Sequence, residues 1–176
     1  DFEAYNEIQT GQPGSNLVYA VWKDGLANPT AYGGSTIGYP AGVSMETAKV
    51  HSGRQSVPLI YDNSTALLSE AELPLAPWNW TDHGVLTLSL WFYGDPNNVP
   101  GQLYVKVNGV KAAYDGEAVN LTRQQWQPWN IDLASVGTNL QSVTSLTVGI
   151  EGAGAKGTVL LDDIRLYPLP RQLITP

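Results

Sequence analysis

Apolar and polar residues alternate with a period of two along several stretches of the chain, and no stretch shows the 3.6-residue period of an amphipathic helix. The clearest alternation places on one side Leu86, Leu88, Leu90 and Phe92, and on the other Thr87, Ser89, Trp91 and Tyr93. Other strand-like stretches are 103–107, 129–133, 146–151 and 160–167, with less regular ones at 1–5, 17–22, 45–50, 55–61 and 67–73. About ten short strands separated by turns predict an all-β fold, a two-sheet antiparallel β-sandwich of the jelly-roll type.

Glycine and proline residues punctuate the chain between these stretches. Loops are expected at 23–43, 74–83, 95–100 and 115–123. The dipeptide Asn108-Gly109 predicts a tight hairpin, because both residues tolerate a positive φ. We expect residues 1–168 to form one β-sandwich domain and 169–176 to form a tail or linker. Because the first residues already look strand-like, we also expect the chain to be part of a larger multidomain protein.

The polar side of the predicted strands carries aromatic rings beside hydrogen-bonding groups. The residues expected on this one face are Trp91, Tyr93, Tyr104, Lys106, Asn130 and Arg165. A pyranose ring stacks its apolar face on an indole or phenol ring, and its rim of hydroxyls needs donors and acceptors. These residues are therefore candidates for sugar contact. The alternative is that loops cover the face and that the rings form a second, smaller core.

A second candidate surface is the loop edge that contains Pro77-Trp78-Asn79-Trp80. Two tryptophans two residues apart are hard to bury together, so we expect at least one to be exposed. Trp80 is expected to pack inward, and Trp78 is the better platform for a sugar ring. A sheet face suits binding along a polysaccharide, whereas a loop edge suits chain ends.

The composition narrows the possible partners. The net charge is −7 and no basic patch is visible, which excludes nucleic acid and disfavours anionic membrane surfaces. Charged residues make up 14% of the chain, well below the usual quarter, as in many secreted β domains. The chain has no cysteine, and no apolar run approaches the roughly 18 residues of a membrane span. We expect a secreted, extracellular protein that binds neutral sugar and divalent cations.

Residue patterns for catalysis are sparse. His51 and His83 are the two histidines, without the spacing of a zinc site, and no Gly-x-Ser-x-Gly elbow occurs. Glu70 and Glu72 share one side of a predicted strand and are the nearest approach to a glycosidase carboxylate pair. The third alternating acid of β-sandwich glucanases is missing, and so is the Gln-x-His strand motif of jelly-roll lyases. The sequence therefore predicts no catalytic residues.

Asp162 is the most specific polar signal. By alternation it shares the inward side of the last predicted strand with Leu160, Ile164 and Leu166. A buried carboxylate is costly unless it is paired or bound to a metal, and the chain has only nine lysines and arginines. Hard oxygen ligands favour Ca²⁺. Glu3 offers a second carboxylate ligand if the first and last strands are neighbours. The alternative to a metal site is that Asp162 lies at a strand end and accepts a hydrogen bond from a loop amide.

Three segments together resemble calcium-containing β-sandwich carbohydrate-binding modules, and also the LamG-like (concanavalin-like) domains of secreted bacterial proteins. The segments are Asp1-Phe2-Glu3, His51-Ser52-Gly53-Arg54-Gln55-Ser56 and Leu161-Asp162-Asp163-Ile164-Arg165-Leu166. The resemblance covers most of residues 1–168. It implies a structural calcium that ties the first strand to the last. The ligands it implies are the side chains of Glu3 and Asp162 and the backbone carbonyls of Ser52 and Arg54.

Three functions remain open from the sequence. The first is a non-catalytic carbohydrate-binding module that recognises a polysaccharide. The second is a glycan-active β-sandwich enzyme, either a glycoside hydrolase or a polysaccharide lyase. The third is a structural or adhesion domain with no sugar ligand.

Overall fold

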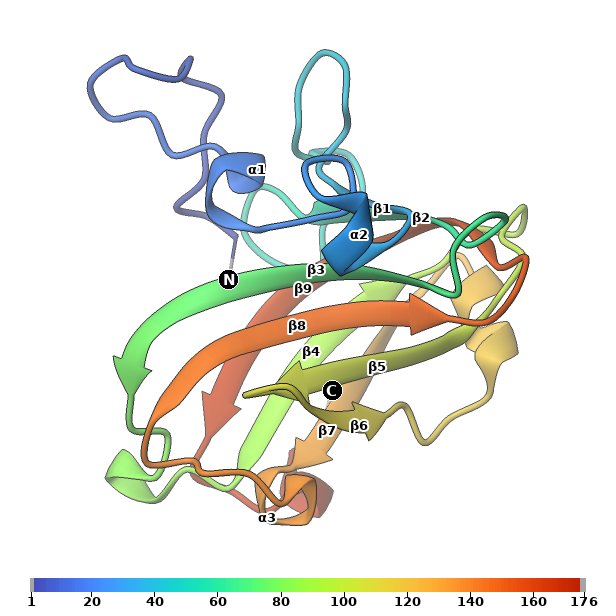
Figure 1. Cartoon of the computed structure of the whole chain (residues 1–176). Coiled ribbons are helices and arrows are strands. Elements are labelled where there is room, and N and C mark those ends of the chain that lie inside the picture. The colour runs from blue at the N-terminus through green and yellow to red at the C-terminus, as the bar shows by residue number, and fades with distance from the viewer. Residues whose placement is uncertain (1, 175–176) are drawn as a thin grey trace.

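A computed structural model describes residues 2–174, which form two antiparallel β-sheets packed face to face (Figure 1). One sheet contains, in spatial order, β1 (Ser35–Ile37), β2 (Val57–Asp62), β9 (Lys156–Tyr167), β4 (Thr87–Tyr93) and β7 (Trp126–Asp132). The other contains β3 (Leu68–Trp78), β8 (Val143–Glu151), β5 (Gln102–Val107) and β6 (Val110–Ala113). The predicted two-sheet β-sandwich is confirmed. The division of the chain at residue 168 stays a prediction.

The helical segments are short. They are α1 (Val18–Val21), α2 (Pro29–Tyr32), α3 (Leu133–Val136) and the 3₁₀ turns η1 (Asp82–Gly84), η2 (Ala118–Thr122) and η3 (Arg171–Leu173). Within residues 2–174, no helix has the length and apolar character needed to cross a membrane.

The core lies between the two sheets and follows the alternation of the sequence. On β4, Leu88, Leu90 and Phe92 are at most 1% exposed, and they belong to one core cluster with Val105 and Val148 of the other sheet. Each fully buried side chain of this size contributes about 1.5–3 kcal/mol to folding. Leu86 departs from the pattern, because β4 begins at Thr87 and leaves this residue exposed.

The predicted hairpin at Asn108-Gly109 is confirmed. Both residues have a positive φ, 50° and 77°, as a two-residue turn that follows the twist of its strands requires. The turn fixes the register of β5 against β6, so that Lys106 lies directly opposite Lys111. Two lysines of adjacent strands therefore project from the same face.

Three predicted strands are absent. Residues 2–5 form a turn, 18–21 form α1, and 45–50 contribute only a single bridge between Glu46 and Ser56. These segments bury isolated apolar side chains such as Phe2 and Met45, and a loop can bury those without a ladder of hydrogen bonds. Conversely, β1 and β6 were not expected. β3 continues through two prolines into the predicted 74–83 loop, because an edge strand tolerates missing N–H donors.

A β-bulge interrupts β9 at Asp163, which has a φ of 48°. Asp162 pairs with Trp91 and Arg165 pairs with Ser89, so β9 has one residue more than β4 between these pairs. The bulge places Asp162 beside Trp91 on the outer face of the sheet. The expectation that Asp162 shares the inward side with Ile164 was therefore wrong. It is buried because a loop covers it from outside.

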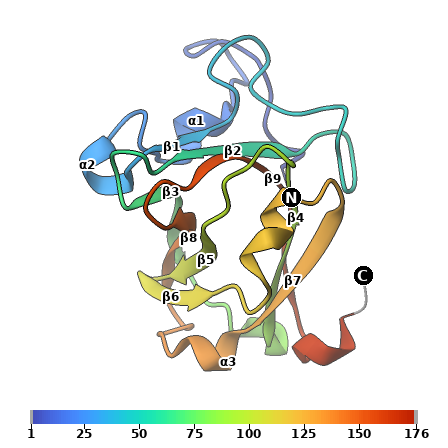
Figure 2. The same cartoon turned by 90° about the vertical axis from the view of Figure 1, so that its right-hand side faces the viewer.

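Loops cover the outer faces of the two sheets unequally. The outer face of the five-stranded sheet lies under the segment 44–56, called here the 44–56 loop, and near the C-terminal residues, where Thr87 Oγ1 donates to the carbonyl of Leu169. The outer face of the four-stranded sheet is bordered by α2 beyond β3 and by β6 beyond β5 (Figure 2). In Figure 1 no loop crosses the centre of this second face at β8.

Candidate functional site

The outer face of the four-stranded sheet is called here the β8 face, because its side chains form rows across β8. One row holds Glu70, Gly149, Tyr104 and Ala113, and the next holds Glu72, Thr147, Lys106 and Lys111. The ring of Tyr104 lies over Gly149, where a Cβ atom would come within 2.6 Å of the phenol carbon. The absence of a side chain at Gly149 lets the Tyr104 hydroxyl cross β8 and donate to Glu70 Oε1 at 2.5 Å.

Two lysines complete the centre of the β8 face. Lys106 Nζ lies 2.5 Å from Glu70 Oε1, so one carboxylate oxygen accepts from both an ammonium and a phenol. Lys111 Nζ lies 4.3 Å from the centroid of the Tyr104 ring and 2.5 Å from Glu151 Oε2. The buried ring is thus covered by a cation, in the geometry that favours a cation–π contact.

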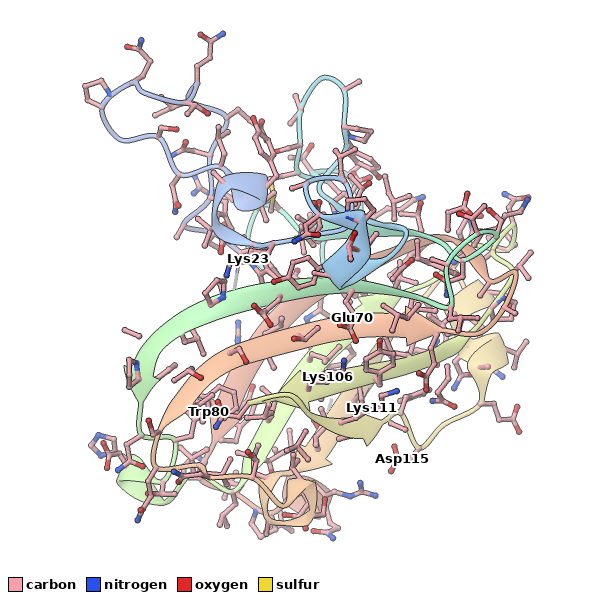
Figure 3. The ribbon with its side chains drawn as sticks, in the orientation of Figure 1. Lys23, Glu70, Trp80, Lys106, Lys111 and Asp115 are labelled. Atoms are coloured by element: carbon pink, nitrogen blue, oxygen red, sulfur yellow. The ribbon has the colours of Figure 1, made fainter. Side chains whose placement is uncertain are left out.

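The rim of the β8 face toward α2 is built around Glu72. Its Oε1 accepts a hydrogen bond from the Tyr32 hydroxyl at 3.1 Å and lies 3.9 Å from Lys23 Nζ. Burial raises the pKa of Tyr32, and the charge of Glu72 raises it further, so the hydroxyl stays a donor. Figure 3 shows Lys23, Glu70, Lys106 and Lys111 spread across this face.

The chemistry of the β8 face is a fixed set of donors and acceptors. Its ion pairs join three lysines to three glutamates, so the face is neutral although the chain carries −7. Burial, together with the hydrogen bond to Glu70, raises the pKa of Tyr104 far above its usual range. Glu70 and Glu72 do share a face, as predicted, but each binds a lysine and a tyrosine of the sheet or its rim. Both carboxylates are therefore already bonded within the protein.

The predicted sugar-contact residues do not lie on one surface. Tyr104 and Lys106 belong to the β8 face, whereas Trp91, Tyr93, Asn130 and Arg165 project from the other sheet. The single-face expectation was wrong because β5 pairs with β8 and β6 and not with β4. Alternation along a strand shows which residues share a side, but it does not show which sheet the strand joins.

The outer face of the five-stranded sheet is largely occupied by the protein itself. The His51 ring stacks on Trp91, with centroids 3.7 Å apart and planes 19° apart. The 44–56 loop also brings Lys49 Nζ to 5.7 Å from the Tyr93 ring centroid. Asn130 accepts from Ser89 Oγ at 2.7 Å and donates to the carbonyl of Ile174. The alternative that loops cover this face therefore holds for Trp91.

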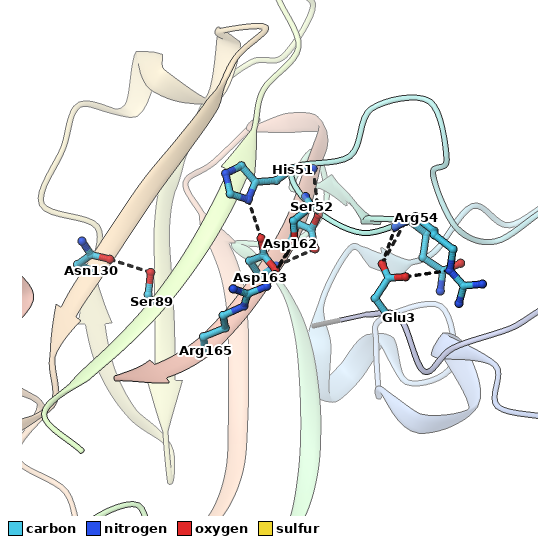
Figure 4. A network of polar contacts seen from close by, with 10 residues as sticks. Glu3, His51, Ser52, Arg54, Ser89, Asn130, Asp162, Asp163 and Arg165 are labelled. Carbon is cyan, nitrogen blue, oxygen red and sulfur yellow. Dashed lines mark hydrogen bonds and ion pairs between the residues drawn. The ribbon is translucent and has the colours of Figure 1, made fainter. Parts of the chain in front are cut away.

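Asp163 anchors the 44–56 loop (Figure 4). Its carboxylate lies 2.6 Å from His51 Nδ1, accepts from Ser52 Oγ at 2.8 Å and pairs with Arg165 Nη2 at 2.6 Å. Burial alone would raise its pKa. The hydrogen bonds from His51 and Ser52 and the charge of Arg165 outweigh burial, so the pKa of Asp163 lies below its usual value.

The predicted metal ligands all lie at or beside residues 51–55 of this loop. Glu3 lies on a turn rather than on the predicted strand, and its Oε1 accepts from the N–H groups of Arg54 and Gln55 at 3.0 and 3.2 Å. Asp162 Oδ2 accepts from the N–H groups of His51 and Ser52 at 3.0 and 3.2 Å. The two carboxylates thus bind opposite ends of residues 51–55. No group of three or more His, Asp or Glu side chains suited to a metal occurs within residues 2–174.

Trp78 is exposed and Trp80 is buried, as the sequence predicts. Trp78 is 53% exposed and Trp80 only 3%, and their rings meet edge to face with centroids 6.2 Å apart. Sequence reasoning missed Lys111 of the β8 face. The tight turn at Asn108-Gly109 contained a signal for Lys111, since its register sets this residue opposite Lys106.

No protein-family model matches the sequence, and no curated protein sequence is similar to it. The fold is similar to a family 11 carbohydrate-binding module from Clostridium thermocellum in complex with a β-1,3-1,4-mixed-linked tetrasaccharide, with a TM-score of 0.53, 15% identity and coverage of 86% of this chain and 89% of that chain. It is similar to a family 30 carbohydrate-binding module, with a TM-score of 0.52, 17% identity and coverage of 76% and 90%.

Part of an exo-β-agarase is also similar in fold, with a TM-score of 0.54, 15% identity and coverage of 76% of this chain and 23% of that chain. The chain spans about a quarter of the length of this agarase and of a second agarase. At these identities the likeness shows the fold, a β-sandwich shared with carbohydrate-binding modules, and not the ligand.

Proposed function

We propose that this domain binds a neutral polysaccharide along the β8 face without cleaving it. The observation that supports the proposal best is the fixed set of lysine and glutamate groups on this sheet face, of which Lys23, Lys111 and Glu151 are the exposed members. Sugar hydroxyls both donate and accept, so a ligand chain finds partners of both kinds there. The balanced charge of the face favours a neutral glycan over a charged one. The similar modules of families 11 and 30 are carbohydrate-binding by name and match over most of their length.

The absence of catalysis is part of the same proposal. A glycosidase needs one carboxyl group to give a proton and another to act as nucleophile or base. Glu70 is held by Lys106 and Tyr104, and Glu72 by Tyr32, which favours a binding role for both. We further propose that the domain is one part of a larger secreted bacterial protein. The cysteine-free composition is consistent with this context, and so is the match to only 23% of the length of the exo-β-agarase.

Replacing Lys111 by methionine should weaken polysaccharide binding about tenfold or more, because a hydrogen bond to a charged group is lost from the centre of the β8 face. Lys111 and Glu151 are each 37% exposed, so the fold should hardly change. The measurement is affinity electrophoresis in gels that contain mixed-linked β-glucan, xylan, mannan or agarose.

The matched control is Lys156→Met, which removes an exposed lysine of β9 and should bind like the parent protein. Incubation of the parent with the same polysaccharides should release no reducing ends. Equal retention of Lys111→Met and the parent by every glycan that the parent binds would contradict the β8 face as the site.

We also propose that a calcium ion binds beside Glu3 and Asp162, with the carbonyls of Ser52 and Arg54. Asp162 is 1% exposed, and burial raises its pKa. No ion pair formed within residues 2–174 includes Asp162. Two carboxylates and the carbonyls of one turn are hard oxygen donors of the kind that Ca²⁺ prefers.

Excess EDTA should lower the melting temperature by about 5–10 °C, and added CaCl₂ should restore it, because an ion that binds only the folded state stabilises it by mass action. MgCl₂ should restore little, since Mg²⁺ demands a stricter octahedral site. The variant Asp162→Asn should melt at the same temperature in EDTA and in CaCl₂. Identical melting of the parent in both solutions, with no metal by elemental analysis, would remove the calcium from the proposal.

A further inference from the structure

A pocket of about 590 Å³ opens at the edge of the sandwich, where the distal part of β3 faces the end of β9. Its inner end is formed by the core residues Leu88 and Leu146, which are 1% and 4% exposed. The core of the sandwich therefore closes the inner side of the pocket. Its volume lies within the roughly 300–1,000 Å³ typical of small-molecule sites. It is separate from the β8 face, with which it shares no residue.

The walls of the pocket combine aromatic rings with hydrogen-bonding groups. The rings include Trp22, Trp78, Trp80 and Tyr167, and the polar groups include Asp82 and Arg165. Trp78 is more than half exposed, so its ring is available for stacking. This combination matches the apolar face and the hydroxyl rim of a pyranose.

One wall group lacks a partner. Trp80 is only 3% exposed. Among residues 2–174, its indole N–H is the one buried side-chain polar atom that has no hydrogen-bond partner. A buried donor without an acceptor costs free energy, and this one is closed off from the open space of the pocket. The preference for a sugar over an apolar molecule rests instead on the polar wall residues Asn79 and Asp82, whose side chains can exchange hydrogen bonds with sugar hydroxyls.

We propose that this edge pocket binds the terminal residue of a neutral sugar chain, as a second site beside the β8 face. It takes an end because the core closes the inner side of the pocket, and its volume of about 590 Å³ suits a short piece of a sugar chain. Trp78 stacks on the terminal ring, and Asn79 and Asp82 exchange hydrogen bonds with its hydroxyls. The site rests on the proposed function, because it assumes a glycan ligand, but it uses other residues.

The test is a tryptophan-fluorescence titration of the whole chain with β-linked disaccharides of glucose, xylose, mannose and galactose, each also in its reduced alditol form. We expect at least one disaccharide to bind, and Trp78→Ala to weaken that binding about tenfold. Trp78→Phe, which keeps a ring, should weaken it less. Tyr19→Ala removes a similarly exposed ring outside the pocket and should leave the affinity unchanged. Comparison of each sugar with its alditol identifies the bound end.

The two binding proposals fail in different ways. If the parent binds polysaccharide but no disaccharide, or if a folded Trp78→Ala binds disaccharides as the parent does, the edge pocket is not a chain-end site and the β8 face stands. If 8-anilinonaphthalene-1-sulfonate binds the parent but not Trp78→Ala and no disaccharide displaces it, the pocket takes apolar ligands and the inference is wrong. The chain-end inference is supported if Lys111→Met binds disaccharides as the parent does and Trp78→Ala binds them more weakly. If no glycan of any length binds, both proposals fail.

Discussion

Replacing Asp163 by alanine is expected to lower the free energy of unfolding by about 3 kcal/mol, the lower end of the range for breaking a buried ion pair. The Asp163 carboxylate is 3% exposed and holds His51, Ser52 and Arg165 at once. Its loss leaves these three groups without their acceptor and releases the 44–56 loop from the sheet. The His51 ring should then leave the face of Trp91. Urea denaturation gives the free energy, and near-ultraviolet circular dichroism reports the environment of the tryptophan.

The control is Asp163→Asn, which keeps the side-chain shape and tolerates the φ of 48°. It should lose less stability than the alanine variant and should respond less to acid. Because the pKa of Asp163 is lower in the folded state than the roughly 3.9 of an unfolded aspartate, its ionised form stabilises the fold above that pH. That contribution is lost as the pH falls through the folded-state pKa. An unchanged unfolding free energy for Asp163→Ala would show that the loop is held by other contacts.

Replacing Glu70 by alanine is expected to cost about 3 kcal/mol of stability and to abolish polysaccharide retention. Glu70 is 6% exposed and is the shared acceptor of Lys106 and Tyr104. Without it, the fully buried hydroxyl of Tyr104 has lost its acceptor, and the ammonium of Lys106 its counter-charge. Urea denaturation measures the stability, and affinity electrophoresis at a temperature where the variant is folded measures the binding.

The double variant Glu70→Leu/Tyr104→Phe separates the two effects. Removing both polar partners of a buried hydrogen bond costs less than removing one, so this variant should recover part of the lost stability. It should not recover binding, because the acceptor is still missing from the β8 face. A double variant no more stable than Glu70→Ala would show that the bond between Glu70 and Tyr104 does not account for the loss.

The alternation of apolar and polar residues was sufficient for the fold class and for much of the core. Leu88, Leu90 and Phe92 are buried as their spacing predicts, because successive side chains of a strand point to opposite faces whatever its neighbours are. The Asn108-Gly109 hairpin followed from two residues that tolerate a positive φ. The contrast between Trp78 and Trp80 followed from the difficulty of burying two large rings in one short loop.

The candidate site depended on contacts between distant parts of the chain. Tyr104 and Trp91 have similar local patterns, yet one lies in the β8 face and the other under His51, because hydrogen bonding between strands assigns them to different sheets. The 44–56 loop reaches Asp163 across 112 residues, and no local pattern encodes that pairing.

The sequence by itself determined the properties that are local or additive: the β-sandwich class, the faces of its regular strands, its tight hairpin and its acidic, cysteine-free composition. Tertiary structure alone decided which strands are neighbours, where the bulge at Asp163 reverses the alternation of β9, and which aromatic rings the loops cover. The physical reason is that a period of two is set by each strand's own backbone, whereas pairing, bulges and coverage minimise the free energy of the whole chain.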